Sequence, residues 1–314
     1  MTSDLYFLSA RKLATLIKEK KISCVELIQT HLDRIQQVNP KLNALVQLAE
    51  PEIVLEKACI ADEKLAKNQI LGPLHGLPIT IKDCCKVSDF IISKGSNGYN
   101  FLPKEDATAV ARLKAAGGII LGISNVPEFN IAYETDNDRY GKTLNPYDLN
   151  RTSGGSSGGE AAIIAAGGSV LGLGSDGAGS IRQPAHNTGI VGLKPTRGLI
   201  PNSGNVPSDG RGLLRPLTTY GPMARFVDDI VLSLPLLVGP DNADPDAMPI
   251  SSIQQQGVGD ENLSNWLNED VVRIAEYFYI EYEPAKLNLY PDNRTAFEGS
   301  REDAMFRSEE RRVG

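Results

Sequence analysis

The chain has 314 residues, enough for one large domain or two of ordinary size. Hydrophobic residues make up 41% of it and charged residues 23%, proportions typical of a soluble globular protein with a sizeable core. The formal net charge of −7 argues against a direct nucleic-acid-binding surface. No apolar run approaches the roughly 20 residues that span a bilayer, so no membrane segment is predicted.

The chain is expected to work in the cytoplasm without a metal or an organic cofactor. Its first residues lack a basic stretch followed by an apolar one, so no secretory signal is predicted. The four cysteines form neither a CxxC pair nor a disulfide framework, which favours a reducing compartment. Two of them, Cys84 and Cys85, are adjacent and are predicted to be buried and inert.

Two helices are predicted in the first 40 residues. Leucine and isoleucine recur with helical spacing over residues 8–17. Ser23 and Glu26 form a capping-box pattern that opens a second helix through Ile35, and Pro40 is expected to end it. This N-terminal helical pair is a candidate for contacts in a homodimer.

Helices and apolar strands then alternate along the chain. Helices are predicted at 52–67, 107–116 and 160–166, and buried strands at 77–82, 119–123 and 169–173. The segments 136–159 and 190–224 are rich in turn-forming residues and are predicted to be mostly loops. This order predicts an α/β fold with a mixed, largely buried β-sheet covered by α-helices.

The composition changes near residue 240. Residues 239–246 have the Pro- and Asp-rich composition of a linker, and residues 301–314 are crowded with Arg and Glu. We therefore predict one domain over residues 1–240, followed by a linker and a divergent or non-native segment over residues 241–314.

Two segments rich in glycine and serine, at 154–159 and 177–180, and the upstream Lys82 carry the candidate chemistry. Serine is a poor nucleophile unless a base removes its proton, and a buried, neutral lysine can be that base. The successive backbone N–H groups of residues 177–180 can form a concave nest for negative charge. The alternatives are a surface Lys82 paired with Asp83, and a tight turn at residues 177–180.

These segments, in this order and spacing, resemble the amidase signature family of serine hydrolases from about Ser9 to about Gly239. The matching blocks lie at 76–83, 145–148, 154–160, 179–185, 192–196 and 221–225. The resemblance implies the amidase signature fold and a Ser-cisSer-Lys triad. In that triad Ser180 is the nucleophile, Ser156 bridges through a cis peptide bond to its predecessor, and Lys82 is the base.

The resemblance also implies an oxyanion hole and residues that brace the loops. The hole is assigned to the backbone amides of Gly177, Ala178, Gly179 and Ser180, and the bracing side chains are those of Ser157, Asp176 and Arg182. Ala178 departs from the family pattern, which has glycine there, and is expected to strain the hole if that position needs a positive φ. The chain is also shorter than typical family members, whose later part completes the sheet and the substrate pocket.

Three functions stay open. The first is a stand-alone amidase that hydrolyses the carbon–nitrogen bond of a small-molecule amide. The second is the glutaminase (the A subunit) of a tRNA-dependent glutamyl/aspartyl amidotransferase, which delivers ammonia to its partners in the complex. The third is an inactive, truncated fragment. Residues 125–129 (NVPEF) favour the stand-alone enzymes, because amidotransferase subunits more often have Met-Asp within this segment.

Other motifs are set aside. Residues 172–177 match GxGxxG, but Pro184 is expected to interrupt the following helix, and no acidic residue follows at the spacing that a dinucleotide site needs. Of the three histidines, His31 is predicted to be a surface or interface residue on a helix, His75 to lie in a turn, and His186 to be structural and not catalytic.

Overall fold

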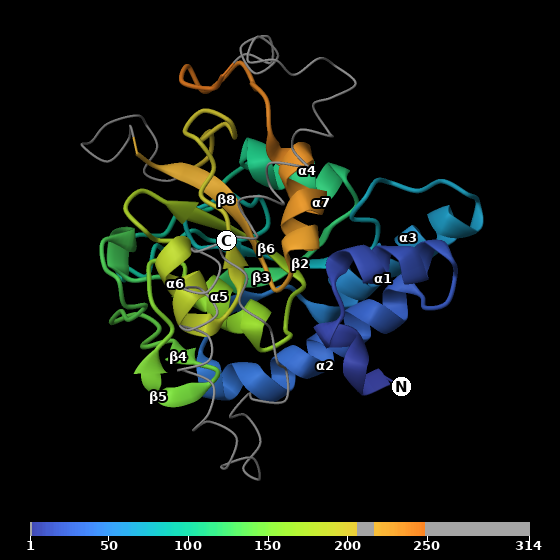
Figure 1. Cartoon of the computed structure of the whole chain (residues 1–314), viewed down its shortest axis with the longest axis horizontal. Coiled ribbons are helices and arrows are strands. Elements are labelled where there is room, and N and C mark those ends of the chain that lie inside the picture. Colours follow the sequence, from blue (N-terminus) through green and yellow to red (C-terminus); the bar gives the residue numbers. More distant parts are fainter. Residues whose placement is uncertain (1, 206–216, 249–314) are drawn as a thin grey trace, which may run out of the picture.

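The structure, a computed structural model, describes residues 2–205 and 217–248 (Figure 1). A six-stranded sheet with the order β1-β3-β2-β6-β8-β7 forms its centre. The strands are β1 (Leu45–Leu48), β3 (Ile119–Ser124), β2 (Pro78–Lys82), β6 (Leu171–Asp176), β8 (Thr219–Ala224) and β7 (Val191–Gly192). β2 is parallel to β3 and β6, whereas β1 is antiparallel to β3 and β8 is antiparallel to β6 and β7. The prediction of a mixed, buried sheet is confirmed.

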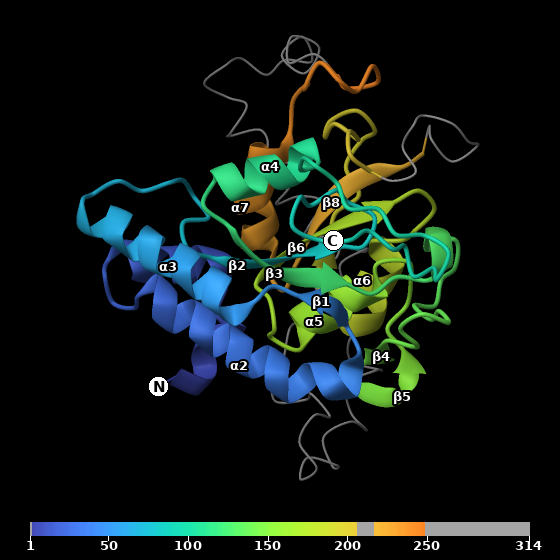
Figure 2. The same ribbon diagram turned by 180° about the vertical axis from the view of Figure 1, so that it is seen from behind.

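Helices surround this sheet. They are α1 (Ala10–Lys18), α2 (Cys24–Leu42), α3 (Pro51–Ala66), α4 (Thr108–Ala115), α5 (Gly158–Ala165), α6 (Arg182–Thr188) and α7 (Val227–Leu237), with 3-10 turns η1 (Thr2–Phe7) and η2 (Glu128–Asn130). α5 packs across β1, β2, β3, β6 and β8. Figures 1 and 2 show α4 and α7 side by side at the top of the view and α2 at its lower side. Among these described helices, none is both long and apolar enough to cross a membrane.

Serine caps open the two N-terminal helices. The Ser9 hydroxyl accepts a hydrogen bond from the backbone amide of Lys12 at 3.1 Å, at the start of α1. The Ser23 hydroxyl accepts one from the amide of Glu26 at 2.9 Å, at the start of α2. Each bond satisfies an amide that has no partner inside the helix. The predicted helical pair is therefore confirmed.

The end of α2 differs from the prediction. The helix continues past Pro40 to Leu42, because a proline near the end of a helix removes only one backbone donor. Asn43 then adopts a left-handed conformation with φ 51° and ends the helix. The side-chain oxygen of Asn39 accepts from the amide of Leu45 at 2.8 Å, which ties the helix to the start of β1.

His31 is buried within the chain, so its predicted place at a surface or an interface is wrong. α2 packs against η1, α3, α5 and β2, so several elements cover this helix. Burial, helped by the nearby positive charge of Arg225, lowers the pKa of His31 to about 3. The imidazole is therefore a neutral part of the core at physiological pH.

Several elements lie in segments predicted to be loops. β4 (Leu144–Asn145) and β5 (Asp148–Thr152) form an antiparallel pair within 136–159. β8 lies within 190–224, where a Cβ atom at Gly221 would collide with the carbonyl oxygen of Leu193. That glycine therefore marks a close approach of two backbone segments and not a turn. Pro184 does not interrupt α6, because it lies in the first turn, where its missing N–H breaks no helical hydrogen bond.

The start of the predicted linker packs against α4. The guanidinium of Arg112 donates to the backbone carbonyls of residues 237–240 at 2.6 to 3.0 Å. The hydroxyl of Thr108 donates to the carboxylate of Asp241 at 2.6 Å. The division into domains near residue 240 stays a prediction, and most of the segment 241–314 lies outside the described residues.

Candidate active site

β2 brings Lys82 into the interior. The strand is buried along its whole length between β3 and β6, and Lys82, its last residue, is 0% exposed. Asp83 does not pair with Lys82, since its carboxylate accepts from the amide of Ser93 at 2.9 Å and from the Ser93 hydroxyl at 2.5 Å. The alternative of a surface lysine paired with Asp83 is therefore wrong.

The Lys82 amine contacts two groups from the glycine- and serine-rich part of the chain. Its Nζ lies 2.6 Å from the hydroxyl oxygen of Ser156 and 3.2 Å from the carbonyl oxygen of Ser175. Burial lowers the pKa of Lys82 against the opposing charges of neighbouring thiols and carboxylates. A lower pKa enlarges the neutral fraction of the amine, and a neutral amine can accept a proton.

The backbone around Ser156 is held from two sides. Gly154 has a φ of +87°, and the peptide bond between Gly155 and Ser156 is cis, the geometry that the family resemblance implies. The amide of Gly155 donates to the side-chain oxygen of Gln183 at 2.9 Å. The amide of Gly158, where α5 begins, donates to the hydroxyl of Thr135 at 3.1 Å. These bonds fix the position of the segment that carries Ser156 relative to α6 and to the loop after η2.

Ser157 joins the first glycine- and serine-rich segment to the second. Its backbone amide donates to the carbonyl oxygen of Ser180 at 3.1 Å, and its hydroxyl donates to the carbonyl oxygen of Ser175 at 3.3 Å. The structure therefore brings the segments of Lys82, Ser156 and Ser180 together, although they are far apart in the sequence.

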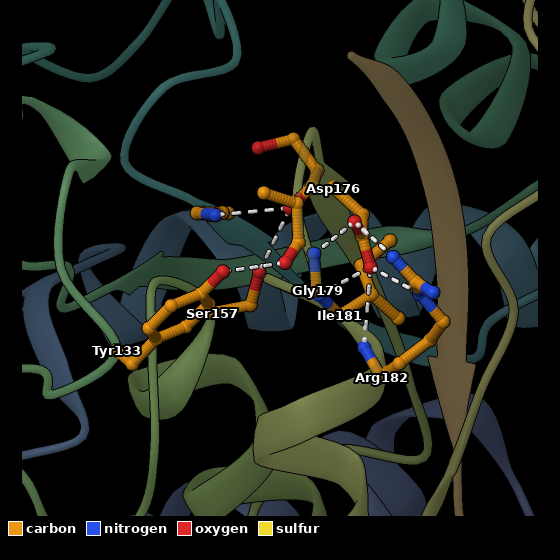
Figure 3. Close-up of polar contacts among 9 residues, drawn as sticks. Tyr133, Ser157, Asp176, Gly179, Ile181 and Arg182 are labelled. Atoms are coloured by element: carbon orange, nitrogen blue, oxygen red, sulfur yellow. Dashed lines mark hydrogen bonds and ion pairs between the residues drawn. The ribbon is translucent and has the colours of Figure 1, made fainter. Parts of the chain in front are cut away.

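Asp176 organises the turn that leads to Ser180 (Figure 3). Its carboxylate accepts from the amides of Gly179 at 2.7 Å and Ile181 at 3.0 Å. It also forms two hydrogen bonds with the guanidinium of Arg182, at 3.0 and 3.1 Å. Burial of Asp176 works against ionisation, but these donors prevail and lower its pKa. Asp176 and Arg182 therefore contact the turn that sequence analysis assigned them to brace.

Asp176→Asn is expected to loosen this turn. The substituted amide cannot accept on both of its polar atoms, so a backbone amide or an Arg182 N–H loses its partner, at a cost of about 1–3 kcal/mol. We expect lower thermal stability and faster amide hydrogen exchange at residues 179–182, measured by mass spectrometry. Unchanged exchange there would show that the carboxylate does not hold the turn.

Gly179, and not Ala178, has the unusual backbone conformation in this turn. Gly179 has a φ of +121°, a region that favours glycine, whereas Ala178 does not have a positive φ. The expected strain at Ala178 is therefore absent. The carbonyl of Ala178 instead accepts a hydrogen bond from the Tyr133 hydroxyl at 2.7 Å. Figure 3 shows Tyr133 reaching from its loop toward the glycine turn.

Sequence reasoning missed the roles of Tyr133 and Glu160. Glu160 lies in the first turn of α5, is fully buried, and accepts a hydrogen bond from the hydroxyl of Thr80 on β2. The available signal was one charged residue in a helix whose other residues are glycine, alanine and isoleucine. No comparable pattern marks Tyr133, whose hydrogen bond depends on the tertiary fold.

Two cysteines and one histidine near these segments are buried. Cys84 and Cys85 are buried, as predicted, and the Cys84 sulfur lies 3.3 Å from the hydroxyl of Ser175. The inertness of these thiols stays a prediction. His75 is buried, with Nδ1 accepting from the amide of Leu71 and Nε2 within 3.1 Å of the carbonyl of Ala61.

Comparison with known proteins identifies the family. The family model described as Amidase matches residues 26–294, so the chain belongs to the amidase family. It is 43% identical over 281 residues to the A subunit of the glutamyl-tRNA(Gln) amidotransferase of Carboxydothermus hydrogenoformans, covering 88% of this chain and 55% of that protein. It is 40% identical over 248 residues to human fatty-acid amide hydrolase 2, covering 76% of this chain and 46% of that protein.

Solved structures agree with this membership. The native peptide amidase of Stenotrophomonas maltophilia superposes with a TM-score of 0.71 at 32% identity, covering 77% of this chain and 50% of that chain. The chain therefore spans about half the length of the relatives it matches. Recognisable similarity was expected to fade after Gly239. The family match continues beyond that residue, to residue 294.

Proposed function

We propose that this chain hydrolyses a carbon–nitrogen amide bond through a serine acyl-enzyme, with Ser180 as nucleophile, Ser156 as bridge and Lys82 as base. The 2.6 Å contact between Lys82 Nζ and the Ser156 hydroxyl, inside the core, carries the proposal. A buried amine with a lowered pKa, next to a serine hydroxyl, fits general-base chemistry.

The proton follows a relay in this mechanism. Ser180 attacks the amide carbonyl carbon while its proton passes to Ser156, and the proton of Ser156 passes to Lys82. The tetrahedral intermediate then collapses, and the ammonium of Lys82 returns a proton through Ser156 to the departing nitrogen. Water repeats the sequence on the acyl-enzyme and frees the acid. This arrangement is a serine–lysine variant of the Ser-His-Asp catalytic triad.

Backbone amides of the glycine turn would stabilise the oxyanion. The amide of Gly179 donates to Asp176, so the contribution of this turn rests on the amides of Gly177, Ala178 and Ser180. Each such donor aimed at the developing negative charge is typically worth about 10²- to 10³-fold in rate. The bracing of the turn by Asp176 and Arg182 supports this role.

The glutaminase of an amidotransferase is the second candidate function. The 43% identity to the A subunit of a glutamyl-tRNA(Gln) amidotransferase favours it. The 40% identity to fatty-acid amide hydrolase 2, together with the NVPEF segment at 125–129, favours a stand-alone enzyme on a small-molecule amide. An inactive fragment is the third, supported by the chain spanning about half the length of these relatives.

Ser180→Ala tests the nucleophile. The purified chain and the variant are exposed to a fluorophosphonate, which phosphonylates activated serines, and intact masses are measured. We expect one adduct on the unsubstituted chain and complete loss of that adduct in Ser180→Ala, because the attacking oxygen is gone. Ser233→Ala, which changes a buried hydroxyl on α7, serves as the matched control and should label normally.

Each outcome separates the candidate functions. No adduct on folded, unsubstituted chain would favour the inactive fragment, and an adduct that survives in Ser180→Ala would reject Ser180 as nucleophile. Where labelling succeeds, ammonia release from glutamine, compared with release from a panel of aryl and fatty acyl amides, distinguishes the glutaminase from the stand-alone amidase.

A further inference from the structure

Glu160 is a buried carboxyl group that the proposed relay does not use. Its Oε1 accepts a hydrogen bond from the hydroxyl of Thr80, which precedes Lys82 by two residues on β2. Side chains two residues apart in a strand point to the same face of the sheet. Thr80 and Lys82 therefore both face α5, the helix that carries Glu160 and packs on β2.

The sheet leaves space for this carboxyl group. Thr80 on β2 pairs with Gly172 on β6, and a Cβ atom at Gly172 would collide with Oε1 of Glu160. A larger residue at this position of β6 would therefore displace the carboxyl group. The second oxygen, Oε2, is buried as well. The hydroxyl of Ser124, the last residue of β3, acts on the same carboxyl group and favours its ionised form. Glu160 thus occupies a fitted space next to two hydroxyl groups.

The charge of Glu160 is poorly compensated in this space. Burial raises its pKa to about 7, against the opposing effects of the Ser124 hydroxyl, the Thr80 hydroxyl and the Lys82 amine. Asp176, another carboxylate that acts on Lys82, already binds the guanidinium of Arg182 through two hydrogen bonds. Lys82 is a cation that acts on Glu160.

We propose that Glu160 is a positioning residue that acts through Lys82: its carboxylate favours the ammonium form of Lys82 and helps to set the pH at which this amine can accept the Ser156 proton. The proposal rests on the proposed function. The ionised carboxylate also stabilises the ammonium that forms when Ser180 attacks the amide carbonyl carbon. The other titratable groups that act on Lys82 are the thiols of Cys84 and Cys85 and the carboxylate of Asp176, and Cys84 also acts on Glu160.

Glu160→Gln tests this role, because glutamine keeps the size and the acceptor for Thr80 but removes the charge. Without the neighbouring negative charge, the pKa of Lys82 should fall. The full chain, labelled with ¹³C-lysine, is titrated by NMR, and the Lys82 resonance is assigned by its loss in Lys82→Met. The acidic limb of the rate of fluorophosphonate labelling against pH should move to lower pH by the same amount.

Two further variants keep the test decisive. Thr80→Val removes the donor to Glu160 while suiting a strand, so the carboxyl group protonates more readily, and the Lys82 pKa should again fall. Asp229→Asn is the matched control: Asp229 is buried with a pKa raised by burial to about 6, but its carboxylate accepts from the amide of Arg11 at the start of α1. This control should leave both the Lys82 pKa and the labelling profile unchanged.

The outcomes separate this proposal from the proposed function. An unchanged Lys82 pKa and pH profile in folded Glu160→Gln and Thr80→Val would overturn the role of Glu160, whatever happens to the maximal rate. A shifted Lys82 pKa with no labelling of the unsubstituted chain at any pH would overturn the proposed function and leave the coupling of the two side chains standing.

Discussion

Lys82→Met is expected to slow acylation of Ser180 by about 10²- to 10⁴-fold, the usual contribution of a general base. The same change should leave the free energy of unfolding within about 1 kcal/mol of the parent. Methionine fills similar space, and although it forfeits the bonds to the Ser156 hydroxyl and the Ser175 carbonyl, it also removes an amine whose burial disfavours its charge.

The pH dependence of stability gives a second signature of this variant. The pKa of Lys82 is lower in the folded chain than its usual value, so the unfolded chain binds more protons between those two pKa values. Stability of the parent therefore rises with pH across that window, and Lys82→Met should lose this contribution to the slope. Unfolding in urea at a series of pH values measures it.

Lys21→Met is the matched control for Lys82→Met. The Lys21 side chain is 64% exposed and pairs with Glu19 at the surface, so this change should alter neither the labelling rate nor the stability appreciably. Near-parental labelling by Lys82→Met across pH would reject the lysine base. Loss of folding in that variant would show that Lys82 is needed for folding as well as for proton transfer.

Sequence alone predicts the parts of this fold that depend on short-range chemistry. Ser9 and Ser23 cap the helices that follow them, because a hydroxyl next to unpaired amides needs no distant partner. The apolar run of β2 predicts a buried strand, and the serine-rich segments downstream make Lys82 at its end a candidate base. Which residues would meet was implied only by the resemblance to the amidase signature family.

Features that depend on tertiary contacts could not be predicted in this way. His31 is buried in a helix that several elements cover, among them α3 and η1, and helical periodicity does not encode such tertiary contacts. β8 contains Gly221 and Pro222, which indicate a turn locally, yet this segment pairs with β6 along its whole length. Glu160, on α5, was missed because its partner Thr80 lies on β2, 80 residues away in the sequence.

Arg225→Ala is expected to give the largest loss of stability among the changes considered. Arg225 is 2% exposed and directly follows β8. One terminal nitrogen of its guanidinium donates to the carbonyls of Ile164 and Ser169, both at 2.7 Å. The other donates to the carbonyls of Tyr6 at 2.7 Å and Leu8 at 3.2 Å. One side chain thus joins the N-terminal segment, the end of α5 and the turn before β6.

Removing this guanidinium leaves four carbonyls without that donor, two of them buried and two part-buried, so we expect Arg225→Ala to lower the free energy of unfolding by about 3–5 kcal/mol. For a chain of this size that corresponds to a fall in melting temperature of roughly 10 °C, measured by calorimetry. Arg225→Lys should recover little of the loss, because a single ammonium cannot reproduce the planar fork that reaches four acceptors.

Arg151→Ala is the matched control for Arg225→Ala. The Arg151 side chain is 57% exposed and pairs with Asp148 at the surface, so its removal should change stability by less than about 1 kcal/mol. Faster hydrogen exchange in Arg225→Ala, concentrated at residues 5–9 and 166–170, would locate the loss at the joined segments. A melting temperature equal to that of Arg151→Ala would show instead that water replaces the four bonds and that hydrophobic packing alone holds the N-terminal segment on the sheet.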